Sequence, residues 1–166
     1  MKKIIALVLV AVMMFLMGCG SNRVQGSNEI LVPDLSPEEA EQNIETIPND
    51  HDTKPDNTDG GAVRLTYSDQ VAIKLNEEIA SLYFGNPGQS NQDMILRIVI
   101  QDKVIAQSGI IPAGYQVKTL LLLHDNVPLL KAGRYSGKFV IYYYDQKTDK
   151  LATVNTEIPI TVVVEK

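Results

Sequence analysis

The side chains that commonly carry chemistry are few in this sequence, and their spacing favours no catalytic or metal site. The chain has two histidines, His51 and His124, whereas a zinc site needs three or four nitrogen, sulfur or carboxylate ligands close together. His124 precedes Asp125, but no Gly-x-Ser-x-Gly turn presents a nucleophile to them, and Ser108 before a glycine favours a loop. The isolated carboxylates show no pairing for glycoside chemistry; they are Asp93, Asp102, Asp125 and Glu157. We therefore predict a protein that is not an enzyme and uses no metal or cofactor.

The single cysteine, Cys19, follows an uncharged stretch of 14 residues, 4–17, that begins after Lys2 and Lys3. This is the layout of a secretory signal, and it is short for a bilayer span of about 20 residues. The sequence Leu16-Met17-Gly18-Cys19 resembles the bacterial lipobox. The resemblance implies a signal peptide over 1–18, cleavage before Cys19 and a diacylglycerol on its thiol. The alternative is an ordinary signal peptide or a membrane helix with an idle cysteine.

Residues 19–61 form an acidic segment with the composition of a flexible tether. Residues 20–61 include ten acidic and two basic residues, which gives a net charge of −8. Polar and acidic composition without periodicity predicts disorder. One short helix over 37–47 is expected inside it, because Ser36, Pro37 and Glu39 form an N-terminal capping pattern. The Asp-rich run 48–61 fails the EF-hand template, so a solvated linker is expected there.

From residue 62 the hydrophobic period is two, which predicts strands. Turn signals separate eight expected strands, near 63–67, 70–75, 78–84, 93–101, 103–107, 115–123, 135–144 and 151–164. Over 62–166 there are ten acidic and eleven basic residues, and no basic stripe marks a nucleic-acid footprint. The segment therefore predicts an all-β sandwich of seven to eight strands, and no nucleic-acid binding.

The stretch Leu130-Lys131-Ala132-Gly133-Arg134-Tyr135 resembles the corner before strand F of immunoglobulin-like domains. The resemblance implies that Gly133 makes the turn and that the Tyr135 hydroxyl bonds a backbone group upstream. Antibody domains have a cysteine and a tryptophan that this segment lacks. We therefore expect an immunoglobulin-like β-sandwich in the broad sense.

If Tyr135 is in phase with the core, the alternate side chains of its strand point outward. An immunoglobulin-like order would place them beside side chains of the 93–101 strand, giving an apolar, aromatic face with one arginine. Such a composition favours a protein-binding face. The expected face is Ile95, Arg97, Val99, Val140, Tyr142 and Tyr144. The alternatives are that strand propensity alone explains these residues or that the N-terminal segment covers them.

These observations predict a membrane-anchored extracytoplasmic lipoprotein that acts as a non-catalytic binding or adhesion module. Its partners would be the membrane, through the lipid on Cys19, and another envelope protein or a surface ligand. One alternative is a structural subunit of an envelope assembly, such as secretion, conjugation or pilus machinery; another is a small-molecule carrier or an enzyme. The combination of lipobox, acidic tether and tyrosine-rich domain resembles uncharacterised surface lipoproteins of Gram-positive bacteria.

Overall fold

The computed structural model describes residues 39–50 and 63–166, and these residues form β-strands with one 3-10 turn. The expected signal peptide, Cys19 and the rest of the acidic segment lie outside the described residues. The elements are β1 Ile44–Thr46, β2 Thr66–Tyr67, β3 Gln70–Lys74, β4 Ile79–Asn86, β5 Gln92–Ile100, β6 Lys103–Gln107, β7 Tyr115–Leu121, η1 His124–Leu129, β8 Gly133–Asp145 and β9 Thr156–Glu165.

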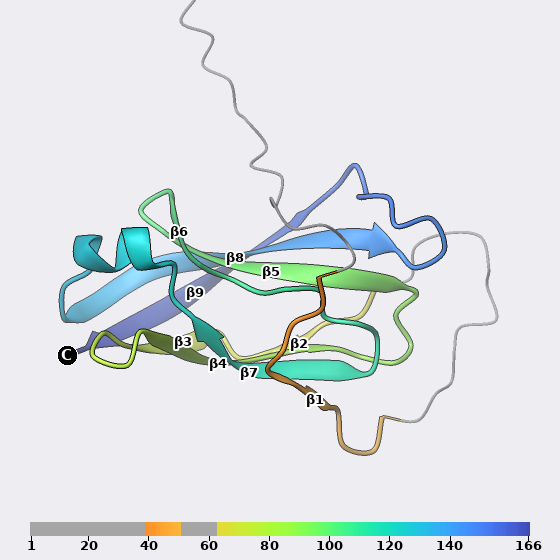
Figure 1. Ribbon diagram of the computed structural model, residues 1–166, viewed down its shortest axis with the longest axis horizontal. Helices are drawn as coiled ribbons and strands as arrows, with labels where there is room; N and C mark the ends of the chain where they lie inside the picture. The colour runs from red at the N-terminus through yellow and green to blue at the C-terminus, as the bar shows by residue number, and fades with distance from the viewer. Residues whose placement is uncertain (1–38, 51–62) are drawn as a thin grey trace, which may run out of the picture. The chain divides into compact units, whose positions relative to one another are not determined.

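The strands lie in two layers that pack face to face (Figure 1). One layer has the order β1-β7-β4-β3, with β2 also paired to β4, and the other has the order β9-β8-β5-β6. Neighbouring strands are antiparallel except β3 and β9, whose parallel pairing joins the layers along one side. This is the arrangement of an immunoglobulin-like sandwich, in which β3, β4 and β7 correspond to strands A, B and E and β5, β8 and β9 to C, F and G. The predicted fold class is confirmed.

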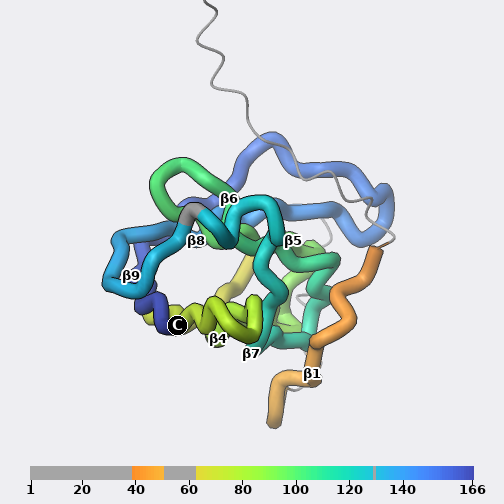
Figure 2. The backbone as a smooth tube through the Cα atoms, turned by 60° about the vertical axis from the view of Figure 1, so that its left-hand side comes forward, coloured from red at the N-terminus to blue at the C-terminus, as the bar shows by residue number. Residues whose placement is uncertain are grey.

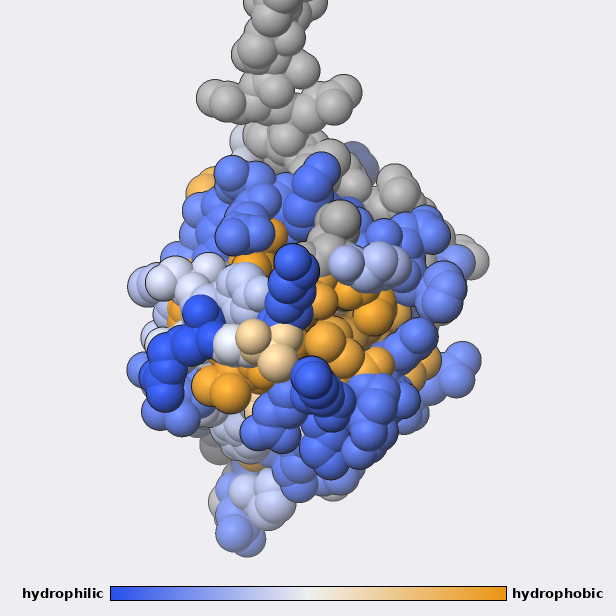
Figure 3. All heavy atoms as spheres, turned by 90° about the vertical axis from the view of Figure 1, so that its left-hand side faces the viewer, coloured by the Kyte–Doolittle hydropathy of each residue, from blue (hydrophilic) through white to orange (hydrophobic). Residues whose placement is uncertain are grey.

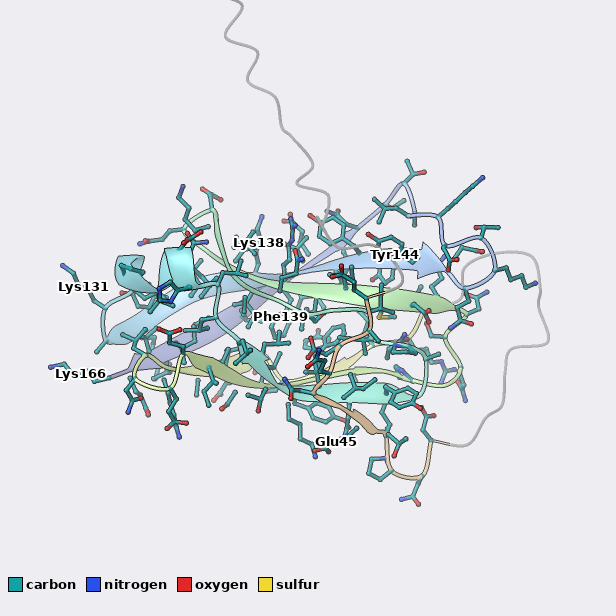
Figure 4. The ribbon with its side chains drawn as sticks, in the orientation of Figure 1. Glu45, Lys131, Lys138, Phe139, Tyr144 and Lys166 are labelled. Carbon is teal, nitrogen blue, oxygen red and sulfur yellow. The ribbon has the colours of Figure 1, made fainter. Side chains whose placement is uncertain are left out.

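Alternating apolar side chains fill the space between the layers. Phe139 of β8 lies between the two layers (Figure 4) and meets Phe84 of β4 edge to face, with ring centroids 6.1 Å apart. Both phenylalanines are fully buried. Aromatic pairs of this geometry add roughly 0.5–1.5 kcal/mol to the stabilisation from burial alone. The inward side chains of β5, β8 and β9 have the period of two that the sequence shows; they are Met94, Leu96, Ile98, Ile100, Phe139, Ile141, Tyr143, Ile160, Val162 and Val164.

The corner before β8 has the expected hydrogen bond. The Tyr135 hydroxyl donates to the carbonyl oxygen of Lys131 at 2.9 Å and accepts from the Lys131 backbone N–H at 3.2 Å. Gly133 has φ +154°, a conformation that side chains disfavour. The tyrosine therefore closes the turn on both polar groups of one residue and sets the register of β8.

The expected helix over 37–47 is wrong for the part that the structure describes. Ala40 forms a parallel bridge to Ile110, residues 42 and 43 form a turn, and Ile44–Thr46 is strand β1. The capping pattern predicts only local preference, and here pairing with existing strand edges satisfies the backbone better than an isolated 11-residue helix would. Residues 39–50, which we had assigned to a disordered tether, belong to the folded domain.

The last strand starts later than expected. It begins at Thr156 rather than residue 151, because Leu151 turns back and bridges Tyr144 at the end of β8. Strand β7 also ends earlier than the expected residue 123, at Leu121. The chain then enters η1, which contains Pro128. These differences affect strand ends and leave the layer order unchanged.

Replacing Tyr135 with phenylalanine should lower the free energy of unfolding by about 0.5–1.5 kcal/mol, because both hydrogen bonds to Lys131 are lost while the ring still packs. Thermal or urea unfolding measures this loss. Tyr67→Phe, at a position 45 % exposed, is the matched control and should leave stability unchanged. Equal stability of the Tyr135 variant and the wild type would contradict the role of the corner.

Candidate functional site

The face predicted to bind a partner is buried in the structure. Its six residues, Ile95, Arg97, Val99, Val140, Tyr142 and Tyr144, are all less than 10 % exposed. They do lie together on the side of β5 and β8 that points away from the other layer, as the strand phase predicts, and Figure 4 shows Tyr144 on that side. With Ile110 the apolar members form a second hydrophobic cluster, against which Val104 and Leu151 pack. The prediction of an open binding face is therefore wrong.

Two chain segments that the sequence pattern treats as loops contribute to this cluster. After β6 the chain continues beside β5, where Met94 and Ile111 exchange both backbone hydrogen bonds, at 3.1 and 2.7 Å. Ile110 in this stretch packs on the face. After β8 the chain folds back, with the Ala152 N–H donating to the Tyr143 carbonyl at 2.8 Å, and this brings Leu151 over the cluster. A period-two pattern says which side a residue faces, but not whether a loop covers that side.

Arg97 is held inside this second cluster. Its guanidinium carbon lies 5.3 Å from the ring centroid of Tyr142, and its Nε donates to the side-chain oxygen of Gln107 on the neighbouring strand. A cation over an aromatic face is a favourable arrangement when desolvated. Burial raises the pKa of Tyr144, an effect that the nearby Arg97 charge partly opposes. The buried arginine thus has an aromatic face and an amide oxygen as partners within the cluster.

The feature that sequence reasoning missed is the docking of residues 39–50, which we call the N-terminal clamp. Its first residues pair with the β5–β6 layer: the Glu41 N–H donates to Ile110 O at 2.9 Å, and the Ile110 N–H donates to Glu39 O at 2.8 Å. Its strand β1 then pairs antiparallel with β7 of the other layer, with Glu45 opposite Gln116. In immunoglobulin order β1 takes the place of strand D beside strand E, but it comes from the chain before strand A. The clamp thus bridges both layers along one side (Figure 2).

Carboxylates fix the clamp at its two ends. Glu41 Oε2 accepts the Gly109 N–H at 2.8 Å, and an Asp50 oxygen accepts the Gly88 N–H. Hydrogen bonds from N–H groups to a charged acceptor are stronger than neutral ones. On the surface, Lys118 Nζ lies 2.6 Å from Glu45 Oε2, and this hydrogen bond lowers the pKa of the Glu45 carboxyl. Figure 4 shows Glu45 at the outer margin of the β1–β7 pair.

Two glycines leave room for the clamp. A Cβ added at Gly109 would lie 2.6 Å from the backbone nitrogen of Glu41 and 2.8 Å from its Cα, distances that backbone atoms cannot relieve easily. At Gly85, a Cβ would lie 2.6 Å from the Thr66 hydroxyl and 3.1 Å from the Ile47 side chain. The sequence signal for the clamp was present in Ile44, Thr46 and Ile47, whose side chains favour strands. The capping pattern of Ser36, Pro37 and Glu39 instead favours a helix over the same residues.

One open groove lies on the outer surface beside the second cluster. It has a volume of about 480 Å³ and is formed by the β5–β6 turn together with β8 and β9. Lys138 Nζ and a Glu157 carboxylate oxygen lie 2.9 Å apart at its side, and Figure 4 shows Lys138 on this outer surface. The residues that line it are Val99, Gln101, Asp102, Ser136, Gly137, Lys138, Glu157 and Pro159. Its size is in the range of small-ligand sites, and its lining offers both donors and acceptors.

The apolar core reaches the surface at one end of the sandwich. Figure 3 views the end that carries η1 and the β3–β4 turn, and it shows an apolar patch surrounded by hydrophilic residues. Leu123, just before η1, is 40 % exposed. Leu75 in the β3–β4 turn and Val127 in η1 pack against the core but are only partly buried.

Of the two histidines, His51 lies outside the described residues and His124 is exposed. His124 Nδ1 is 3.4 Å from Glu78 Oε2 on the surface, and Ser108 is fully buried, where its hydroxyl accepts the Leu96 N–H at 2.9 Å. Among residues 39–50 and 63–166 no group of three histidine, cysteine, aspartate or glutamate side chains is placed to hold a metal ion. In the same ranges, no helix has the length and hydrophobicity to cross a membrane.

The strand order places the described domain in the class of immunoglobulin-like β-sandwiches. No protein-family model matches the chain, and no curated protein matches it. Among solved structures, the chain is similar to the major subunit of aggregative adherence fimbriae type I from Escherichia coli, with 9 % identity and a TM-score of 0.34, over 66 % of this chain and 98 % of that one. A likeness this distant carries no argument about function.

Replacing Gly109 with alanine should detach the start of the clamp, because the new Cβ meets the Glu41 backbone at under 3 Å. We expect a loss of roughly 1–3 kcal/mol, typical of overpacking a fitted site. Hydrogen exchange should show faster exchange at the Glu41 and Ile47 amides, which donate to Ile110 and Gly114.

The matched control for this variant is Gly88→Ala, where the atoms nearest to an added Cβ belong to the Asp50 side chain, at 3.4 Å and beyond. It should retain protection at both amides. Protection of the Glu41 amide in Gly109→Ala equal to that in the control would show that the docking described above is wrong.

Proposed function

We propose that this protein is an extracytoplasmic lipoprotein, anchored through a diacylglycerol on Cys19, whose immunoglobulin-like domain is a non-catalytic binding or adhesion module. The single observation that carries the proposal is the small number of residues between the lipobox cysteine and the docked clamp. Glu39 is already docked on the domain, so 19 residues, 20–38, separate it from Cys19. A domain with so short a connection to a lipid acts at the membrane.

The length of this connection limits where the module can act. At 3.3–3.6 Å per residue, the 20 steps from Cys19 to Glu39 span at most about 65–70 Å. A random coil of the same length would average about 25 Å. If the whole acidic segment to residue 61 were tether, as the sequence alone predicts, the extended connection would span about 140–150 Å. A partner would therefore be met close to the outer surface of the membrane.

The groove beside Lys138 and Glu157 is the surface we propose for contact with the partner. Its lining combines the apolar side chains of Val99 and Pro159 with a charged pair and the serine Ser136. A polar, extended stretch of another envelope protein, or a surface ligand with several hydrogen-bonding groups, fits this chemistry. The second candidate function is a structural subunit of a larger envelope assembly, in which the same groove would face a neighbouring subunit.

Replacing Cys19 with alanine should release the protein from membranes or leave it unprocessed. Without the thiol no acyl chain is attached, and the membrane affinity of about 0.8 kcal/mol per buried methylene is lost. Fractionation of cells followed by mass measurement of the N-terminus tests this, with Ser21→Ala as the control that stays anchored. A processed Cys19→Ala chain in the membrane fraction would rule out lipid anchoring at this residue.

A bulky side chain in the groove should block the partner. We expect Ser136→Trp to reduce recovery of a partner from detergent-solubilised membranes at least about tenfold, as loss of a central interface contact does. Lys150→Trp, at an exposed loop position outside the groove, is the control. Equal recovery in both variants would remove the groove from the proposal, and recovery of a stoichiometric multiprotein complex would favour the assembly subunit over the binding module.

A further inference from the structure

We propose that residues 39–50 exchange between two copies of this chain, so that the clamp of each copy docks on the other and a closed dimer forms. The acceptor is the seam between the two layers, bounded by Ile110 on one side and β7 on the other. The partner surface is the clamp of a second copy, identical to the one seen here. This goes beyond the proposed binding function, since it assigns a second interaction surface with a different partner.

The clamp is held by contacts that can be made equally well by another molecule. Its backbone pairs with Ile110, with Gly114 in the turn before β7, and with the edge of β7. Its apolar side chains over the seam, Ile44 and Ile47, are only half-buried, whereas the centres of β5 and β8 are fully enclosed. Segments with few buried apolar contacts open locally at a free energy well below that of global unfolding. The clamp can therefore leave the seam while the core stays folded.

The seam is shaped for a strand whichever chain supplies it. Gly109 and Gly85 leave the space that the clamp backbone and Ile47 fill, and the Gly109 and Gly88 N–H groups point to the carboxylates of Glu41 and Asp50. All the groups of the seam that receive the clamp lie in residues 85–117 of the domain. None of them depends on the covalent link between the clamp and its own domain.

The link between clamp and domain is long enough for exchange. Twelve residues, 51–62, join Asp50 to the start of the described domain at Val63. At 3.3–3.6 Å per residue they span up to about 40 Å, more than the width of a small domain. Exchange of an identical element through such a link is a low-cost route to a closed dimer, because each contact is made again in the partner.

Concentration decides which form is populated. The contacts are the same in both arrangements, so the single chain is favoured by its effective concentration, which is on the order of millimolar for two elements joined by a short linker. Exchange is therefore expected to rise as the protein approaches that concentration. If the chain is anchored as proposed above, confinement to one membrane surface raises the local concentration in the same direction.

A disulfide that can form only between chains tests the exchange. In the full chain with Cys19 replaced by serine, one preparation carries Glu45→Cys and the other Gln116→Cys. These positions are Cα partners in the β1–β7 register. The thiol at position 45 of one chain therefore reaches the thiol at position 116 of another only when the clamp of the first chain is docked on the second. After mixing and oxidation at about 1 mM, we expect at least tenfold more mixed dimer than in the control, and a yield that rises with concentration.

The control is the same experiment with Ser136→Cys and Thr161→Cys, which are partners in the β8–β9 pair at the centre of the fold. These strands cannot exchange without global unfolding. A chain that carries both Glu45→Cys and Gln116→Cys should oxidise within itself and then stop exchanging. A mixed-dimer yield equal to the control, or a dimer that persists in the internally oxidised chain, would overturn the proposal.

The acylated chain in phosphatidylcholine–phosphatidylglycerol vesicles separates this proposal from the proposed anchoring. Mixed dimer at bulk concentrations at least tenfold lower than in solution is expected if both hold. A chain that fails to float with the vesicles contradicts the anchoring alone, because the solution experiment lacks Cys19 and still decides whether the clamp exchanges.

Discussion

Unpaired strand edges are the constraint around which this domain is arranged. Each edge presents a row of backbone N–H and C=O groups that water must solvate or another strand must pair. On one side of the sandwich, the parallel pairing of β3 with β9 removes two edges at once. On the other side, Ala106 bridges Leu122, and the clamp pairs first with Ile110 and then with β7. A segment from outside the predicted domain thus completes the sandwich.

This closure also explains why the aromatic face is not open. The stretch that leads from β6 to β7 carries Ile110, whose backbone receives the clamp and whose side chain packs on the second cluster. The same residue therefore links the clamp to the packing around Val140 and Tyr142. Leu151, in the stretch between β8 and β9, also packs against the cluster. The outer side of the sheet is a small second core, and the groove beside Lys138 and Glu157 lies at its margin.

The sequence predicts the layers well and the loops poorly, for a physical reason. Alternation in β5, β8 and β9 reports burial on one side of a strand, and residues such as Phe139 and Val162 occupy the core as that period requires. The corner at Tyr135 is local, so six residues suffice to predict its hydrogen bond. The positions of Leu151 and Ile110 depend on where a loop folds back, which no periodicity encodes. Residues 36–47 carry a capping signal and a strand signal together, and only the presence of free strand edges elsewhere decides between them.

The order of elements along the chain also sets how this domain would carry mechanical load. If the chain is held at Cys19 and a partner pulls on the sandwich, the tension arrives at Glu39 before it reaches any core strand. The clamp pairs through a three-residue strand and a single bridge, whereas β8 and β9 pair over nine positions. The clamp would therefore yield first and release residues 39–62, adding about 80 Å of extended chain. The sandwich would remain folded at the end of a longer connection. When the tension falls, the clamp would dock on the seam again.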